Sequence, residues 1–452
     1  MSIESANVNR VMIAGTDSGC GKTTVTCAVL SALKNRGLDV GAAKCGPDYI
    51  DPMFHRSVIG APSTNLDPFF FDDNTLRFLL AKNGAERELT VAEGVMGYYD
   101  GLGLTTAKAS AYDLARITKT PVILTVNAKG ASLSILAQIK GFSEFVPESF
   151  IKGVILNNCS ERVYSALAPE IAARLGIKPL GFMPHVPEAE IGSRHLGLIT
   201  ADEIDDIKAR TSRLAEQAEK SLDLDGIVGL ARTAPRLSFE PFVPAPREPV
   251  RIAVARDRAF CFYYEDSLGL LREMGARLVP FSPLEDAALP DGINALYLGG
   301  GYPELYAGRL SANIAMRQSV LNALKSGLPC IAECGGFMYL TDRIGEYPMV
   351  GLIKGSCFDN GRLTRFGYVT LTAETDNMLC KKGGRIPAHE FHHWDAEAPG
   401  DSFTAQKPNG PARPCVHASE TLYAGYPHIH FYACPSFAEG FYNACLKEKH
   451  RV

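Results

Sequence analysis

Short apolar runs rich in β-branched residues alternate with longer amphipathic stretches along most of the chain. The stretch 23–34 predicts a helix that Gly37 ends, and the charged, Ala-rich stretch 202–224 predicts a helix that closes the first half. The apolar runs of this half predict strands at 11–14, 38–43, 89–92, 122–126 and 154–156. Strands that alternate with helices are typical of a parallel sheet covered by helices on both faces.

A proline-rich segment interrupts this alternation. Residues 235–249 contain five prolines in fifteen positions, a composition that favours an extended linker with little secondary structure. The alternation then restarts, with predicted strands and helices at 251–255, 264–275, 295–298, 314–326 and 329–332. We therefore predict two α/β domains, residues 1–234 and 250–452, joined by the linker 235–249.

Composition narrows the class of protein. A chain of 452 residues exceeds what one hydrophobic core usually supports, and 46% apolar with 21% charged residues is an ordinary globular balance. The net charge of −4 argues against a broad nucleic-acid surface, and no apolar stretch is long enough to span a membrane. The first ten residues lack the pattern of a secretory signal, and the twelve cysteines form no zinc-finger pairs. These features predict a cytoplasmic protein with neither nucleic-acid nor membrane partners.

A glycine-rich loop lies between the first predicted strand and the first predicted helix. It reads Gly-Thr-Asp-Ser-Gly-Cys-Gly-Lys-Thr-Thr over residues 15–24, although Gly15 stands one residue earlier than G-x-x-x-x-G-K-[ST] requires. Such a loop cradles phosphates with backbone N–H groups, its lysine reaches the outer phosphates, and its hydroxyl binds Mg²⁺. A tight turn with an exposed lysine is the alternative. The predicted ATP-binding residues are Gly19, Cys20, Gly21, Lys22, Thr23 and Thr24.

Carboxylates follow two of the neighbouring predicted strands. Asp48 and Asp51 come after the second strand, and Glu93 follows the third. Ligands of open parallel sheets bind beyond the carboxyl ends of the strands, where oxygen ligands and phosphates together hold Mg²⁺. Each acid alone could instead cap a helix or a turn. Jointly they indicate a metal-assisted phosphoryl-transfer site with Thr23, Asp48 and Glu93 as metal ligands.

A phosphate-binding loop also occurs in molecular switches. Partition-type ATPases of this fold carry a second lysine five residues before the loop lysine, where this chain has Asp17. That substitution disfavours a dimerising switch.

A candidate nucleophile lies in the second half. Cys334 ends an apolar strand and precedes two glycines, a context that exposes a side chain on a sharp elbow. A helix N-terminus behind the elbow should lower the pKa of the thiol. Backbone N–H groups of Gly300, Gly301 and Gly335 are candidates for an oxyanion hole. Cys330, inside the same strand, is the nearest alternative cysteine.

The nucleophile needs a base, and the segment 426–431 offers His428 and His430, either of which could instead be structural. A third histidine segment, His-Glu-Phe-His-His at 389–393, matches the zinc-protease pattern H-E-x-x-H. That chemistry requires a helix, and the glycines and prolines around the segment disfavour one. We predict a polar strand that lines a ligand pocket.

Together, GTDSGCGKTT, KCGPDYIDP, EGVMGYYDG, LGGGYPE, AECGGFMYL, HEFHH and HIHF resemble the corrin-ring amidases, a family of glutamine-hydrolysing tetrapyrrole a,c-diamide synthases. The likeness runs in order from about residue 10 to 442. The longer phosphate loop is usual in this family and in its dethiobiotin synthetase-like relatives. The resemblance implies a P-loop NTPase domain followed by a class I, triad-type glutamine amidotransferase domain.

The resemblance also implies a reaction. ATP, with Mg²⁺ as cofactor, would convert the a- and c-acetate carboxylates of cobyrinate into acyl phosphates, and ammonia from L-glutamine would displace the phosphate. By position, Cys334 carries over as nucleophile and His428 as base, and the acyl-phosphate and substrate site takes Lys44, Asp48, Tyr49 and Asp51. Many triad glutaminases place Glu two residues after the histidine, where this chain has His430.

Three alternatives stay open at this point. The macrocycle could be a sirohydrochlorin, as nickel-sirohydrochlorin or siroheme, in place of cobyrinate. The chain could also be a nucleotide-gated binding protein with an inactive glutaminase-like domain, although Cys334 and His428 are both retained. The oligomeric state is undetermined, a homodimer being one alternative.

Overall fold

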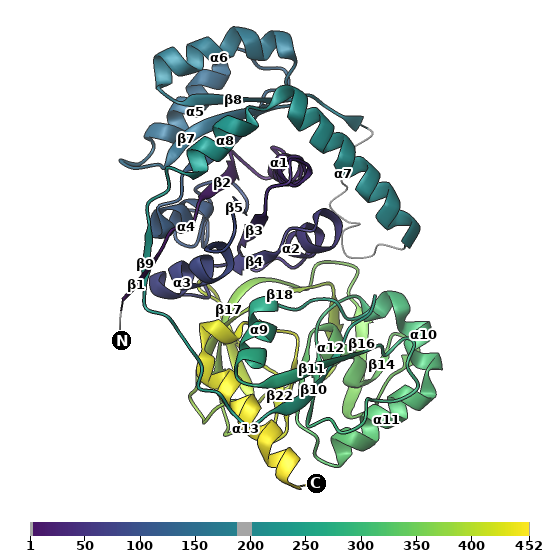
Figure 1. The fold of residues 1–452 in the computed structure, drawn as a ribbon. Coiled ribbons are helices and arrows are strands. Elements are labelled where there is room, and N and C mark those ends of the chain that lie inside the picture. Colours follow the sequence, from purple (N-terminus) through teal and green to yellow (C-terminus); the bar gives the residue numbers. More distant parts are fainter. Residues whose placement is uncertain (1–2, 188–200, 452) are drawn as a thin grey trace. The chain divides into compact units, whose positions relative to one another are not determined.

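The computed structural model describes residues 3–187 and 201–451, and the chain divides into two compact units, Met1–Phe242 and Val243–Val452 (Figure 1). The division falls inside the proline-rich segment 235–249. The first part of that segment is a strand rather than irregular chain, because β9 (Leu237–Phe239) pairs antiparallel with β1 (Glu4–Ala6). Among the described residues, no helix is both long and apolar enough to cross a membrane.

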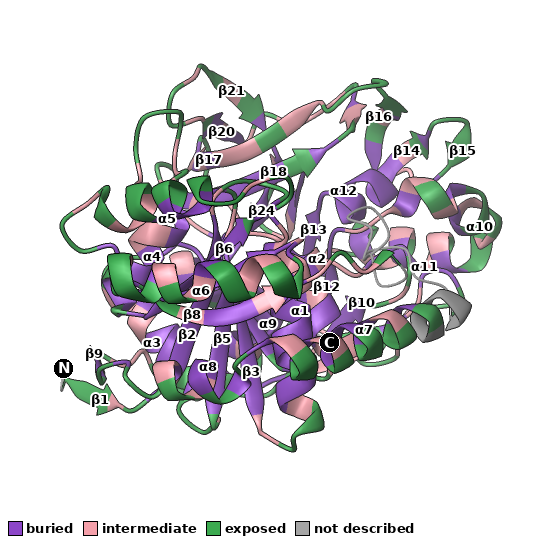
Figure 2. Cartoon of the chain, turned by 90° about the horizontal axis from the view of Figure 1, so that it is seen from above, coloured by how far each residue is buried: buried purple, intermediate pink, exposed green. Residues whose placement is uncertain are grey.

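Unit 1 is built on a seven-stranded sheet in which every neighbouring pair is parallel, as predicted. The strands are almost wholly buried, since helices cover both faces (Figures 1 and 2). In spatial order they are β4 (Ser63–Leu66), β3 (Val40–Cys45), β5 (Leu89–Glu93), β2 (Arg10–Gly15), β6 (Val122–Asn127), β7 (Ile151–Asn157) and β8 (Lys178–Met183).

The helices of unit 1 bury apolar faces against this sheet, and α1 also packs against α7. The predicted helix 202–224 is two helices, because Asp223 accepts a hydrogen bond from the Gly226 N–H at 2.8 Å and caps a second one. The helices are α1 (Lys22–Asn35), α2 (Ile50–Phe54), the π-helical turn η1 (His55–Ile59), α3 (Asp73–Gly84), α4 (Ala111–Thr118), α5 (Ser134–Glu144), α6 (Glu161–Leu175), α7 (Ala201–Ser221) and α8 (Leu224–Ala231).

Unit 2 has a six-stranded central sheet that is parallel except at one edge, where β22 and β23 run antiparallel. The predicted α/β alternation is therefore confirmed for the centre of this unit. In spatial order the strands are β11 (Ala276–Phe281), β10 (Val250–Ala255), β12 (Ala295–Leu298), β13 (Cys330–Glu333), β23 (Leu422–Gly425) and β22 (His417–Ala418).

Two further sheets, formed mostly by residues 341–429, complete unit 2. One contains β15 (Tyr347–Pro348), β14 (Thr341–Ile344), β16 (Ile353–Asp359) and β19 (Trp394–Ala396). The other contains β21 (Ala412–Cys415), β20 (Phe403–Gln406), β17 (Arg365–Ala373), β18 (Arg385–His392) and β24 (His428–Ile429). The helices and turns are α9 (Glu265–Glu273), η3 (Pro303–Tyr306), α10 (Ala307–Ala312), α11 (Ile314–Lys325), α12 (Gly335–Leu340), η4 (Phe431–Ala433) and α13 (Pro435–Arg451).

The two units place their polar motifs alike. In unit 1, β2 leads directly into the glycine-rich loop, and Glu93 is the last residue of β5. In unit 2, β12 leads into Gly299–Gly301 and β13 leads into Cys334. Because parallel strands end at a common edge, each unit gathers its candidate chemistry at the carboxyl edge of its own sheet.

Candidate active sites

The glycine-rich loop connects β2 to α1 and depends on glycine at its last turn. Gly21 is the N-cap of α1 with φ of 99°, a left-handed conformation that favours glycine. A Cβ atom at this position would lie 1.9 Å from Nδ2 of Asn157, which donates a hydrogen bond to the Cys20 carbonyl at 2.9 Å. The loop is thus tied to the end of β7, and only glycine fits.

The side chains of Lys22 and Thr23 make hydrogen bonds within the site. Lys22 is largely buried, and its Nζ donates to the Asp17 carbonyl within the same loop at 2.7 Å. Thr23, in the first turn of α1, donates from Oγ1 to Oε1 of Glu93 at 2.7 Å. This hydrogen bond places the Thr23 hydroxyl oxygen of the loop next to the Glu93 carboxylate oxygen at the end of β5.

A buried charge network surrounds Glu93. Nζ of Lys44 lies 2.9 Å from Glu93 Oε1 and 2.5 Å from Asp51 Oδ2. Burial acts to lower the pKa of Lys44, but Asp51 and Glu93 override it and raise that pKa well above its usual value. Burial and the charge of Glu93 raise the pKa of Asp51, whereas Lys44 and His55 outweigh burial and lower the pKa of Glu93. Lys44 and His55 thus keep Glu93 ionised, and Asp51 is the carboxyl that more readily holds a proton.

Asp48 and Tyr49 lie beside this network. Oδ1 of Asp48 accepts a hydrogen bond from the Ile50 N–H at 2.9 Å, so its carboxylate supports the turn into α2. Its charge nevertheless acts on both Lys44 and Asp51. Tyr49 is buried at the N-cap of α2. In residues 3–187 and 201–451, no group of three or more His, Cys, Asp and Glu side chains is arranged to hold a metal ion.

His55, which belongs to none of the predicted motifs, has a side chain that is fully buried in this network. Its Nε2 lies 3.4 Å from Glu93 Oε2, and its Nδ1 is 3.3 Å from the Ser63 hydroxyl. The available signal was its spacing of four residues from Asp51, because residues four apart share one helix face.

Cys334 lies on a sharp elbow between β13 and α12. Its φ of 48° and ψ of −103° are strained for a residue with a Cβ atom. Two backbone hydrogen bonds hold it there, from the Cys334 N–H to the Gly425 carbonyl at 2.7 Å and from the Met338 N–H to the Cys334 carbonyl at 2.9 Å. Such strain is typical of functional positions.

The three glycines predicted for the oxyanion hole lie next to one another and to His428. A Cβ atom at Gly335 would lie 3.2 Å from the Gly301 nitrogen, and one at Gly300 would lie 2.5 Å from Cε1 of His428. The elbow, the glycine loop after β12 and the histidine of β24 therefore form one connected set of contacts.

The two candidate histidines have different surroundings. His428 is buried, and its pKa is lowered to about 3 by burial and by His389 and His392. His430 is buried elsewhere: its Nδ1 accepts from the Tyr432 N–H at 3.2 Å, and its ring lies 4.8 Å from the Tyr264 ring. A neutral imidazole is the form that accepts a proton, and His428 is the histidine beside the glycine loop.

The expectation of a lowered thiol pKa at Cys334 is wrong. Burial, followed by the charge of Glu304, raises it, and the carboxylates of Glu333 and Glu390 act in the same direction. The Gly335 N–H opposes them but does not prevail, because α12 has only six residues and the thiol is almost completely buried. A base is therefore needed to form the thiolate.

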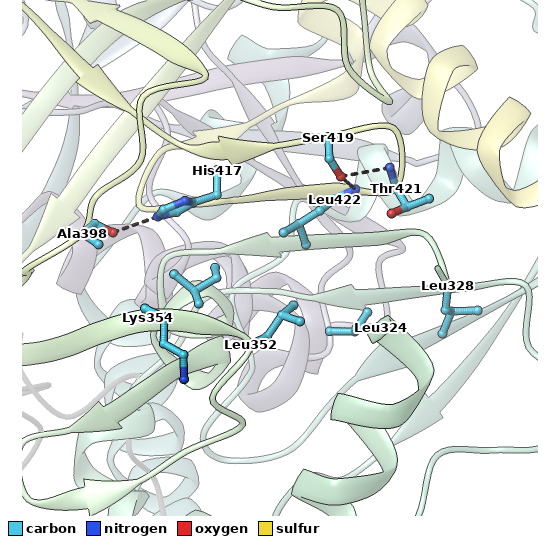
Figure 3. Close-up of a pocket in the computed structure, with 10 residues that line it drawn as sticks. Leu324, Leu328, Leu352, Lys354, Ala398, His417, Ser419, Thr421 and Leu422 are labelled. Atoms are coloured by element: carbon cyan, nitrogen blue, oxygen red, sulfur yellow. Dashed lines mark hydrogen bonds between the residues drawn. The ribbon is translucent and has the colours of Figure 1, made fainter. Parts of the chain in front are cut away.

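Residues 389–392 of the His-Glu-Phe-His-His segment are strand, as predicted, and belong to β18 (385–392), whereas His393 lies just beyond the strand. Its Glu390 and His392 help line a cavity of about 260 Å³. A larger cavity of about 510 Å³ in unit 2 includes neither Cys334 nor His428 (Figure 3). Its lining is mostly apolar and consists of Leu324, Leu328, Leu352, Ile353, Lys354, Ala398, His417, Ser419, Thr421 and Leu422.

Comparison with known families agrees with this division of the chain. Residues 11–199 match the CobQ/CobB/MinD/ParA nucleotide binding domain, and residues 251–435 match the CobB/CobQ-like glutamine amidotransferase domain. A nucleotide-binding unit fused to a glutamine amidotransferase unit defines a glutamine-dependent carbon–nitrogen ligase.

Curated relatives give the family. A protein of Listeria monocytogenes (strain F2365) is 39% identical over 94% of this chain and 97% of its own length. One of Thermoplasma volcanium is 39% identical, with 97% and 98% covered, and one of Limosilactobacillus reuteri (strain DSM 20016) is 40% identical, with 85% and 86% covered. All three are named cobyrinate a,c-diamide synthase, and the chain belongs to the cobyrinate a,c-diamide synthase family.

Proposed function

We propose that the chain converts the a- and c-acetate carboxylates of cobyrinate into amides in cobalamin biosynthesis, with ATP and glutamine as co-substrates. The observation that carries the proposal is that one chain contains two separate clusters of the predicted side chains. One joins a phosphate-binding loop to the Lys44–Glu93 network. The other joins the Cys334 elbow to His428 and the glycine loop.

In unit 1, the substrate carboxylate attacks the γ-phosphorus of ATP and ADP leaves, which gives an acyl phosphate. This step depends on positioning and on charge stabilisation. Lys22 reaches the transferred phosphate, and Lys44 neutralises charge beside it. The oxygen atoms of Thr23 and Glu93 are hard ligands of the kind that Mg²⁺ prefers, and Glu93 Oε2 is a buried acceptor with Nε2 of His55 at 3.4 Å. Bound there, Mg²⁺ would supply charge neutralisation.

In unit 2, His428 takes the proton of the Cys334 thiol, and the thiolate attacks the amide carbon of glutamine. The backbone N–H groups of Gly301 and Gly335 receive the oxyanion, as in other acyl transfers. The protonated His428 then gives its proton to the departing nitrogen, which leaves as ammonia, and water hydrolyses the thioester to glutamate. Ammonia displaces phosphate from the acyl phosphate and leaves an amide.

The experiment that tests this is mass spectrometry after incubation of the full chain with ATP, Mg²⁺, glutamine and cobyrinate. Two successive exchanges of oxygen for nitrogen support the proposal. If exchange occurs on a sirohydrochlorin and not on cobyrinate, the chemistry stands and the proposed substrate is wrong. Cys334→Ala should abolish the use of glutamine and leave amidation driven by ammonium salts. Lys22→Ala should abolish both amidations while glutamine is still hydrolysed at a basal rate.

A further inference from the structure

The base of the glutaminase site lacks the carboxylate that usually follows it. Where many triad glutaminases have Glu, two residues after the histidine, this chain has His430. The structure shows that His430 does not replace it, since its Nδ1 accepts from the Tyr432 N–H and its ring packs on Tyr264.

Another carboxylate, that of Glu333, lies near Nδ1 of His428. Glu333 is the last residue of β13, immediately before Cys334, and it is buried. Its Oε1 accepts from the N–H of Ile429 at 2.9 Å, and its Oε2 accepts from the Tyr297 hydroxyl at 3.0 Å. The same Oε2 lies 4.0 Å from Nδ1 of His428. Two donors from different strands therefore fix the carboxylate beside the imidazole.

The ring of His428 has two distinct sides. Nδ1 lies toward Glu333, whereas Nε2 lies toward the glycine loop, 3.3 Å from where a Cβ atom of Gly300 would be. In acyl-transfer triads the nitrogen away from the carboxylate exchanges the proton, and the carboxylate fixes the tautomer and stabilises the imidazolium. The order is the same here, with the carboxylate beside Nδ1 and the glycine loop beside Nε2, although Nδ1 and Oε2 lie 4.0 Å apart.

We propose that Glu333 is the positioning residue that orients His428 and stabilises its charged form, in place of the carboxylate absent at position 430. The proposal deepens the proposed function, because it takes His428 as the base. A separation of 4.0 Å is an ion-pair contact and is longer than a hydrogen bond, so we expect the pair to close as His428 takes the thiol proton. The proposed nucleophile, Cys334, and the carboxylate that stabilises its base, Glu333, are then neighbours in sequence at the end of β13.

The groups around His428 define the pH dependence to be expected. His389, directly opposite on β18, and His392 disfavour its charged form, and Glu333 favours it. Burial raises the pKa of Glu333 to about 7. Since only the ionised carboxylate stabilises an imidazolium, glutaminase kcat/KM should rise as pH increases through the range near that value.

Glu333→Gln in the full chain tests the proposal, because Gln keeps the shape and the acceptor for Ile429. We expect glutaminase kcat to fall about 100-fold or more, with KM for glutamine little changed and the rise near neutral pH lost. Amidation driven by ammonium salts should persist and shows that unit 1 is folded. The matched control is His430→Gln, which should keep the wild-type kcat and pH profile.

Two results would overturn the proposal: a Glu333→Gln variant with kcat within threefold of wild type, or one with lowered kcat but an unaltered pH profile. Where Glu333→Gln does not fold, Glu333→Asp carries the test, since it keeps a carboxylate one methylene shorter. It should retain the rise near neutral pH at reduced kcat, and a flat profile refutes the proposal. Cys334→Ala separates the two levels, because glutamine hydrolysis that survives it contradicts the proposed function rather than the role of Glu333.

Discussion

Replacement of Lys44 by Met tests the buried charge network most directly. The ammonium lies 2.5 Å from Asp51 and 2.9 Å from Glu93, and all three side chains are buried. Met keeps the length of the stem and removes the charge, which leaves two carboxylates facing one another. Loss of one partner from a buried ion pair typically costs about 3–5 kcal/mol. For a unit of this size that corresponds to a fall in Tm of about 6–20 °C.

The assay is urea unfolding of the full chain at several pH values, with the transition of unit 1 followed separately from that of unit 2. In the wild type the pKa of Glu93 is lowered, so its stabilisation is present above the ordinary glutamate value and is lost as pH falls through the lower folded value. In Lys44→Met the carboxylates take up protons as pH falls toward 4.5, so the deficit should shrink. The double variant Lys44→Met/Glu93→Gln is the control and should recover part of the loss. A Lys44→Met variant within 1 kcal/mol of wild type at neutral pH would refute the reasoning.

Three further predictions follow from single contacts. Gly21→Ala should strongly impair ATP turnover, because its Cβ would lie 1.9 Å from Nδ2 of Asn157. Gly19→Ala, with φ of 88° but open space around its Cβ, should have a smaller effect. Equal KM values for ATP in the two variants would contradict this prediction. Gly301→Ala should suppress glutamine hydrolysis and spare ammonium-driven amidation, because its Cβ would lie 2.1 Å from the Ala259 carbonyl oxygen; glutaminase rates like those of wild type would exclude a tight fit there. Burial lowers the pKa of His430 to about 3 from 6.5, so the unfolded chain binds a proton that the folded chain does not, and stability falls as pH drops below about 6.5. His430→Phe should therefore flatten the dependence of unit 2 stability on pH by about 1.4 kcal/mol per unit between pH 4.5 and 6, and an unaltered slope would show that His430 is protonated in the folded state.

The partly exposed parallel edge strands β8 and β11 were missed, whereas the central parallel strands could be predicted because they are fully buried. Such strands appear as continuous apolar runs, and β2, β5 and β12 were found within two residues of their bounds. The edge and antiparallel strands of residues 341–429 were mostly missed, since they are short, partly exposed and interrupted by glycine and proline. Their pairing depends on contacts between distant segments, which no local pattern records.

The residues of the candidate sites also fall into two groups, those that a local motif indicates and those that only folding brings together. Lys22, Thr23 and Cys334 belong to contiguous motifs, in which local sequence fixes the turn as well as the side chain. His55 belongs to no such motif, and Glu333 lies in AECGGFMYL with no local sign of its role, because both gain their surroundings only when separate strands and helices assemble. The prediction of a lowered thiol pKa at Cys334 failed for a related reason. The sequence indicated the helix that follows the thiol, but it did not indicate that folding brings Glu304 and Glu390 close to it.

The raised thiol pKa has a consequence for how the second site works. A thiol that stays protonated at neutral pH is a poor nucleophile, so in the proposed mechanism Cys334 reacts only when a base takes its proton. His428 is neutral and able to accept, yet its burial opposes the charge that it would then carry. A nearby carboxylate would relieve that opposition, and Glu333 is held beside His428 by Tyr297 and the Ile429 N–H. Because burial keeps the Cys334 thiol protonated, its reaction depends on a base, and that base needs a carboxylate such as Glu333 to stabilise its charged form.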